Sequence, residues 1–137
     1  MKKLVGLWID HEKAVVVTLE GERETIAKVD SGVEGHFRLS GGSKSSTPYG
    51  PEDVASDKKP DERRKHQLHR YYQNIIKSIS DADSIFVLGP GEARVELEKE
   101  IRLVKRLAPK LAAVRRVDKM TDRQVAALVR KFFGVEK

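Results

Sequence analysis

The sequence contains no cysteine, which excludes a disulfide framework and a zinc site built from thiolates. Aromatic residues are also scarce, at 6% of the chain. No apolar run is long enough to cross a bilayer, and the N-terminal apolar run at residues 4–9 is too short for the core of a signal peptide. We therefore expect a cytoplasmic protein that does not associate with membranes.

The chain has 137 residues, of which 39% are hydrophobic. A chain of this size hides roughly two thirds of its unfolded surface, which is enough for one core without metal or disulfide support. We expect a single domain over residues 1–137.

Basic residues exceed acidic ones, 27 to 21, giving a formal charge of +6. An excess of this sign favours an acidic partner, most often nucleic acid, over a neutral metabolite. Ordinary solvated surface is the alternative, so the positions of the charges must decide.

Three short strands are predicted at the N-terminus. Residues 4–9 and 14–19 are apolar and β-branched, and the polar stretch between them has the length of a hairpin connection. A weaker alternating strand follows a second turn at residues 20–22. Residues 31–60 then carry glycines, prolines and a Ser-Gly-Gly-Ser run, which predicts a long flexible loop.

The second half of the chain alternates helical and strand patterns. Apolar residues at helical spacing predict a helix after Pro60, and residues 84–88 predict a buried strand. A helix over residues 92–107 closed by Pro109, a strand over about 111–117 and a helix from the Thr121 capping box to Gly134 complete the pattern. The order β-β-β-α-β-α-β-α predicts a ribonuclease H-like three-layer α/β fold with a mixed sheet of about five strands.

This fold draws attention to Asp10, which follows the first strand where enzymes of the ribonuclease H type hold a metal-binding carboxylate. Two-metal cleavage needs several converging carboxylates, and the predicted strand at residues 84–88 contributes none. A turn role for Asp10 is the simpler interpretation, so it remains a weak catalytic candidate. We expect no metal and no cofactor.

A cluster of cations at the start of the helix after Pro60 is the strongest feature of the pattern. It stands beside the Gly/Ser-rich loop, whose glycines let a backbone pass close to an irregular surface such as folded RNA. Two histidines one turn apart stand among these cations, which would repel a metal ion and suit phosphate instead. The candidate RNA-binding residues are Arg38, Gly41, Gly42, Ser43, Lys44, Lys58, Lys59, Arg63, Arg64, Lys65, His66, His69 and Arg70.

The order of elements, the Gly-Gly loop before the first helix and the segment Val87-Leu88-Gly89-Pro90-Gly91-Glu92-Ala93-Arg94 resemble the middle domain of the archaeal and eukaryotic class-1 release factor and its relative Pelota. The resemblance spans nearly the whole chain. In the release factors a Gly-Gly-Gln loop helps water hydrolyse peptidyl-tRNA in the ribosome. Here Ser43 stands where that glutamine would be, a departure that argues against termination activity.

The resemblance implies a ribosome- or RNA-binding, translation-associated protein of the release or rescue type, in which a GTPase partner is possible because Pelota acts with one. Two alternatives remain open at this stage. One is an enzyme, either a peptidyl-tRNA hydrolase or a weak metal-dependent nuclease, and the other is a protein-interaction module. The sequence does not specify the oligomeric state.

Overall fold

The computed structural model of this chain describes residues 2–32 and 60–135. The elements are β1 (Lys3–Ile9), β2 (Lys13–Glu20), β3 (Arg23–Asp30), α1 (Pro60–Ser78), β5 (Ser84–Gly89), α2 (Glu92–Arg102), the 3₁₀ helix η3 (Ala108–Lys110), β6 (Leu111–Arg116) and α3 (Asp122–Phe133). The predicted order of strands and helices is confirmed. Most of the loop predicted at about residues 31–60 lies outside the described residues.

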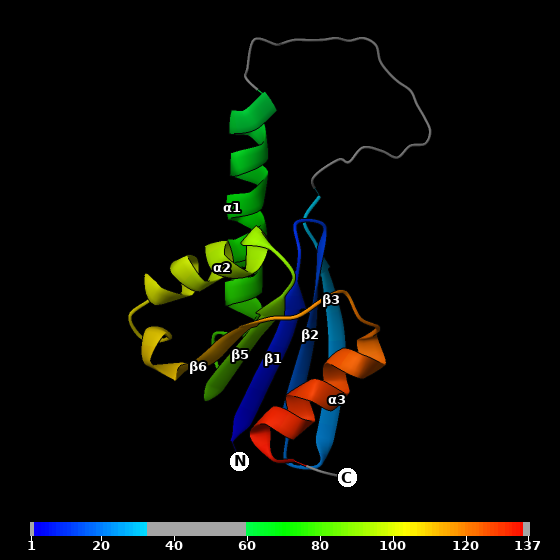
Figure 1. The fold of residues 1–137 in the computed structure, drawn as a ribbon. Coiled ribbons are helices and arrows are strands. Elements are labelled where there is room, and N and C mark those ends of the chain that lie inside the picture. Colours follow the sequence, from blue (N-terminus) through cyan, green and yellow to red (C-terminus); the bar gives the residue numbers. More distant parts are fainter. Residues whose placement is uncertain (1, 33–59, 136–137) are drawn as a thin grey trace.

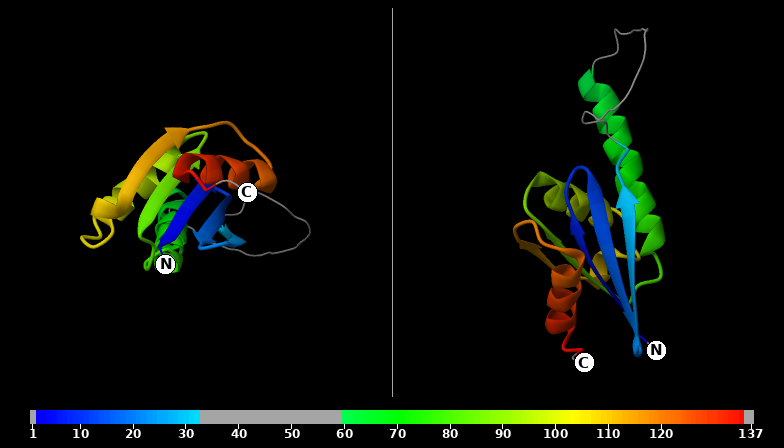
Figure 2. Two further views of the ribbon diagram at one scale, coloured as in Figure 1. Left: turned by 90° about the horizontal axis from the view of Figure 1, so that it is seen from below. Right: turned by 90° about the vertical axis from the view of Figure 1, so that its right-hand side faces the viewer.

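The five strands form one mixed sheet in the order β3-β2-β1-β5-β6 (Figure 1). The β1–β2 and β2–β3 pairs are antiparallel, whereas β1–β5 and β5–β6 are parallel. Figure 2 shows α1 and α3 on opposite sides of this sheet. The predicted three-layer mixed α/β fold is therefore confirmed.

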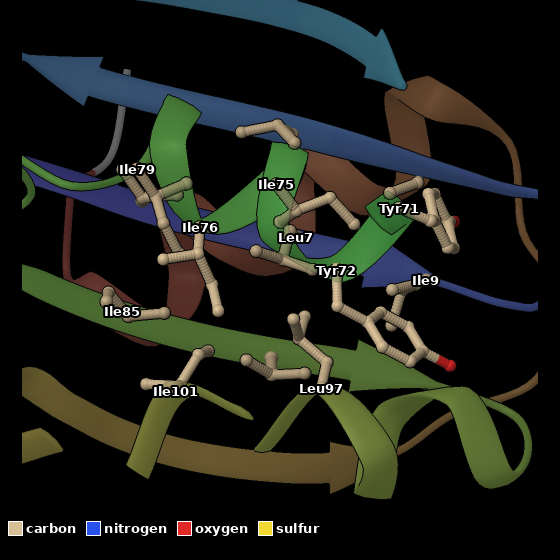
Figure 3. Close-up of a cluster of buried hydrophobic side chains, with 14 of the residues drawn as sticks. Leu7, Ile9, Tyr71, Tyr72, Ile75, Ile76, Ile79, Ile85, Leu97 and Ile101 are labelled. Atoms are coloured by element: carbon tan, nitrogen blue, oxygen red, sulfur yellow. The ribbon is translucent and has the colours of Figure 1, made fainter. Parts of the chain in front are cut away.

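The two central strands are apolar on both faces because each face of the sheet is covered. On β1, Leu7 and Ile9 pack in the cluster below α1 and α2, while Trp8 packs in the cluster below α3. On β5, Ile85 joins the first cluster and Phe86 the second. Figure 3 shows the first cluster, in which Leu97 and Ile101 of α2 meet the apolar side of α1.

The helix predicted over residues 92–107 is shorter than expected. α2 ends at Arg102, and η3 contains the Pro109 that was expected to close it. In a continuous helix Leu103 and Leu107 would share a face, since they are four residues apart. In the structure Leu107 is fully buried and Leu103 is 78% exposed, so the chain must turn between them.

The C-terminal helix follows its sequence signals closely. Thr121 Oγ1 accepts a hydrogen bond from the backbone N–H of Gln124, and the Gln124 side chain accepts one from the N–H of Thr121. At the other end Gly134 adopts the left-handed conformation, with φ of 72°. The predicted capping box and glycine C-cap are both present.

Candidate nucleic-acid interface

The first half of α1 projects beyond the sheet (Figures 1 and 2). The buried apolar side of the helix begins at Leu68 and continues to Ile76, with Ile79 just past its end. Residues 62–66, which precede this stretch, are all exposed. A helix normally needs an apolar face against a core, and this part of α1 has none among the described residues.

The charge of this projecting part surrounds the helix axis. At about 100° per residue, Arg63, His66 and Arg70 lie opposite the apolar side of the helix. Arg64 and Lys65 lie on the apolar side but precede Leu68, so no core covers them. Cations therefore face several directions around one helical segment, and a large polyanion could approach it from more than one side.

These predicted site residues share one exposed surface, which we call the α1 basic segment: Arg63, Arg64, Lys65, His66, His69 and Arg70. Within residues 2–32 and 60–135, no carboxylate forms an ion pair with Arg63, Lys65 or Arg70. His69 Nδ1 lies 3.7 Å from Glu100 Oε2. Most of this positive charge is therefore not neutralised by the described chain.

The remaining predicted RNA-binding residues are Arg38, Gly41, Gly42, Ser43, Lys44, Lys58 and Lys59. All of them lie outside the described residues. Their place in the interface stays a sequence-based prediction.

Two tyrosines hold α1 against the end of β1 and against α2. The Tyr71 hydroxyl donates to the backbone oxygen of Asp10 at 2.9 Å. The Tyr72 hydroxyl donates to Glu96 Oε1 at 2.5 Å. Figure 3 shows both phenol oxygens at the same end of the buried cluster, near Ile9. These contacts fix α1 just below the basic segment and so set the direction in which it projects.

Burial raises the pKa of both tyrosines above its ordinary value. For Tyr72, the hydrogen bond to Glu96 and the charge of that carboxylate raise the pKa further, whereas the nearby charge of Arg64 lowers it. Both phenols therefore stay neutral in the folded protein and act as hydrogen-bond donors at neutral pH.

A second set of polar contacts links α2 to α1 and to the β1–β2 turn. His11 Nε2 lies 3.2 Å from Glu96 Oε1, and Gln73 donates to Glu100 Oε1 at 3.0 Å. Sequence reasoning missed this set. The signal available was the spacing of Glu96 and Glu100, which are one turn apart on the same flank of a helix.

Asp10 acts as a turn residue. Its Oδ1 accepts hydrogen bonds from the backbone N–H groups of Glu12 at 2.8 Å and Lys13 at 2.9 Å, which closes the β1–β2 connection. Among residues 2–32 and 60–135, no three His, Asp or Glu side chains are grouped as metal ligands would be. The two hydrogen bonds in the turn thus explain the presence of a carboxylate at position 10, which the sequence had made a weak catalytic candidate.

The basic residues at the end of α2 and after it are placed differently from those at the start of α1. The Arg115 guanidinium lies 5.4 Å from the centre of the Phe86 ring and 5.9 Å from that of Phe132. Arg116 donates to the backbone oxygen of Pro90, and Arg102 pairs with Glu98 on the same helix. Several of these cations therefore cover apolar surface or bind the chain itself.

The Gly89-Pro90-Gly91 turn links β5 to α2. A Cβ built on Gly89 would lie 2.4 Å from the backbone oxygen of Ile9, so glycine is required for the close approach of β5 to the end of β1. Arg94 donates to the oxygen of Gly89 across the turn. These contacts explain the glycine at the start of the motif as a packing requirement.

No family model and no curated protein matches the sequence. The fold, in contrast, is similar to solved structures. The Pelota protein of Thermoplasma acidophilum matches 97% of this chain with a TM-score of 0.57 and 13% identity. An archaeal protein matches the same share with a TM-score of 0.55 and 18% identity. The archaeal translation termination factor aRF1 matches 97% of this chain with a TM-score of 0.51 and 13% identity.

At these identities the similarity establishes the fold. The chain spans only 32% of the Pelota protein, 34% of the archaeal protein and 40% of aRF1, which is about a third of their length. The resemblance of this chain to Pelota and release factors is thus present at the level of structure.

In the part of the chain that the structure describes, no helix is both long and apolar enough to cross a membrane.

Proposed function

We propose that this protein binds RNA or the ribosome and acts in translation, with the α1 basic segment as its contact surface. The observation that carries this proposal is the exposed stretch at residues 62–66 of α1, in which Arg63, Arg64 and Lys65 face different directions around the helix axis before Leu68, the first core residue of the helix. A buried or ion-paired cluster of the same composition would not support it.

Phosphate groups are the ligands that such a surface suits. Lysine and arginine contacts to phosphates supply affinity that falls steeply with salt and carries little sequence information. Folded RNA is recognised mainly by shape, and a projecting helix can enter an irregular surface that a flat sheet cannot. His66 and His69 add hydrogen-bond donors on the same segment.

The structural similarity to the Pelota protein and to aRF1 supports the translation context. The finer proposal is a release- or rescue-type factor that lacks the glutamine of the Gly-Gly-Gln loop, with Arg38, Gly41, Gly42, Ser43, Lys44, Lys58 and Lys59 extending the contact surface. A GTPase partner is part of this proposal on the basis of the family resemblance alone.

The test is cosedimentation of the full chain with ribosomes in a sucrose gradient at low and at physiological salt. We expect wild-type protein to migrate with ribosomes or subunits and to dissociate as salt rises. The variant Arg63→Glu/Arg64→Glu/Lys65→Glu should remain at the top of the gradient with an unchanged melting temperature, because the three side chains contact no core.

A matched control is Lys99→Glu/Lys105→Glu/Arg106→Glu, which changes the net charge equally at three exposed residues on or after α2. This control should keep most of the ribosome binding. Unchanged cosedimentation of the α1 variant, or equal loss in the control, would contradict the proposed surface. Wild-type protein that never sediments and recovers no RNA would indicate a protein partner instead.

A further inference from the structure

Among the described residues, the outer edge of β3 is not paired with another strand. β3 is the last strand in the sheet order β3-β2-β1-β5-β6. Residues 25–28 in its middle are all exposed. Ile26 is 40% exposed and, with Leu103, is one of two large apolar side chains exposed among the described residues.

Alternate residues of β3 direct their backbone N–H and C=O groups toward this edge. The N–H of Ser31 donates to the oxygen of Glu12 at 2.9 Å, which continues the register in which Asp30 faces Lys13. Hydrogen-bonded pairs alternate along an antiparallel ladder, so the odd-numbered residues of β3 bond to β2. Glu24, Ile26, Lys28 and Asp30 therefore direct their N–H and C=O groups outward.

Glu24, Ile26 and Lys28 place their side chains on the α3 side of the sheet. Glu24 pairs with Arg130 at 2.6 Å and Lys28 pairs with Asp122 at 3.1 Å, both on α3. Since side chains alternate along a strand, Ile26 lies on this face between the two charges. The edge thus presents the series acid, isoleucine, base on one face, together with the unbonded backbone groups.

We infer that β3 pairs with β3 of a second copy of this chain, antiparallel and centred on Ile26, which joins two five-stranded sheets into one. In this register each Glu24 faces Lys28 of the other copy, Ile26 faces its own counterpart, and Thr25 faces Ala27. Glu24, Ile26 and Lys28 of one strand meet the same three residues of the other, so their outward backbone groups pair at the centre of the joint, and Asp30 faces the turn residue Glu22 at either end.

Other registers and other strands fit less well. A two-residue shift in either direction places Ile26 opposite Glu24 or Lys28, so the two isoleucines no longer meet and the Glu24–Lys28 pairs are lost. Charged side chains on an edge strand normally deter pairing with unrelated strands. Here they select a partner with a base opposite Glu24 and an acid opposite Lys28, which an antiparallel copy of the same strand supplies.

The helix α3, which covers this face of the sheet, leaves room for the second copy. α3 packs against β1 and β2, and reaches β3 through the two ion pairs just described. Two copies related by a two-fold axis at Ile26 therefore keep their α3 helices on either side of the joined strands. A strand-to-strand contact of this length buries little surface, so we expect a concentration-dependent dimer.

The test is sedimentation velocity of the full chain from about 5 to 500 µM. Wild-type protein should rise in average mass from 15.5 kDa toward twice that value. Glu24→Lys alone, or Lys28→Glu alone, should raise the dissociation constant roughly tenfold or more, because each change places like charges opposite one another twice across the two-fold axis.

An equimolar mixture of the two single variants discriminates this register from other contacts. In the mixed pair one chain carries a base at both positions and the other chain carries an acid at both, so each base again faces an acid. The mixture should therefore dimerise although neither variant does so alone. Lys105→Glu, an exposed charge change after α2, should dimerise like wild type. A mixture that stays monomeric, or a control that also fails to dimerise, would overturn the inference.

A backbone test is independent of charge. Ile26→Pro removes an N–H that points outward, so it should abolish dimerisation while the β2–β3 ladder and the melting temperature are largely kept. Wild-type protein that remains at 15.5 kDa over the whole concentration range would also refute the proposed pairing.

Discussion

Asp10 shows how one polar side chain determines the geometry around the end of β1. Its carboxylate accepts two backbone hydrogen bonds in the β1–β2 turn, and its backbone oxygen accepts the hydroxyl of Tyr71 from α1. The residue thereby connects the turn to the helix that carries the basic segment.

We expect Asp10→Ala to lower the free energy of unfolding by about 1–2 kcal/mol, since two N–H groups lose their acceptor. Asp10→Asn retains an oxygen in the same place and should cost clearly less. Urea denaturation of both variants measures the difference. Equal losses in the two variants would mean that the charge, and not the acceptor, stabilises the turn.

Gly6 is a second residue whose identity depends on a contact with a residue far away in the sequence. A Cβ on Gly6 would lie 2.3 Å from Cγ2 of Val129, because α3 packs directly on β1. Gly6→Ala should therefore destabilise the protein by about 1–3 kcal/mol through overpacking. Denaturant titration gives this value.

The partner substitution provides the control. Val129→Ala leaves a space in the wild-type core, but it removes the atoms that Gly6→Ala would strike. The double variant should lose less stability than the sum of the two single losses. Additive losses would show that the two residues do not share this contact.

At the scale of elements, α1 and α3 differ in what holds them. α3 is bounded by its own sequence, with a capping box at Thr121 and a left-handed Gly134. The first half of α1 extends past its core contacts, and the tyrosines and glutamines further along anchor the helix. A single substitution can therefore test the cap of α3, whereas the direction of α1 depends on contacts with several other parts of the chain.

Thr121→Ala should reduce stability by about 1 kcal/mol, because the N–H of Gln124 loses its acceptor at the helix start. Thr121→Ser keeps the hydroxyl and should restore most of that loss. Thermal unfolding followed by circular dichroism provides the measurement. A serine variant as unstable as the alanine variant would contradict a capping role.

For the whole molecule, the buried tyrosines make stability depend on alkaline pH. Their folded-state pKa values are raised above the ordinary value of about 10, so the unfolded chain releases these protons first. The stabilisation is complete below pH of about 10 and is lost as pH rises above it. Tyr72→Phe should make this alkaline decline shallower than in wild type.

The measurement is the free energy of unfolding from urea titrations at several pH values between about 8 and 11. A Tyr72→Phe variant with the same slope as wild type would contradict this origin of the alkaline instability.

The sequence by itself determined the order of elements, the two-sided burial of β5 and the ends of α3, because periodicity and capping depend on residues close in the chain. It also located the cationic cluster at the start of α1. Only the tertiary structure decided that α1 extends beyond the sheet, that the backbone oxygen of Asp10 accepts the Tyr71 hydroxyl, and that Glu96 and Glu100 accept hydrogen bonds from α1. These outcomes depend on contacts between residues far apart in sequence, and the early end of α2 depends likewise on which leucine reaches the core.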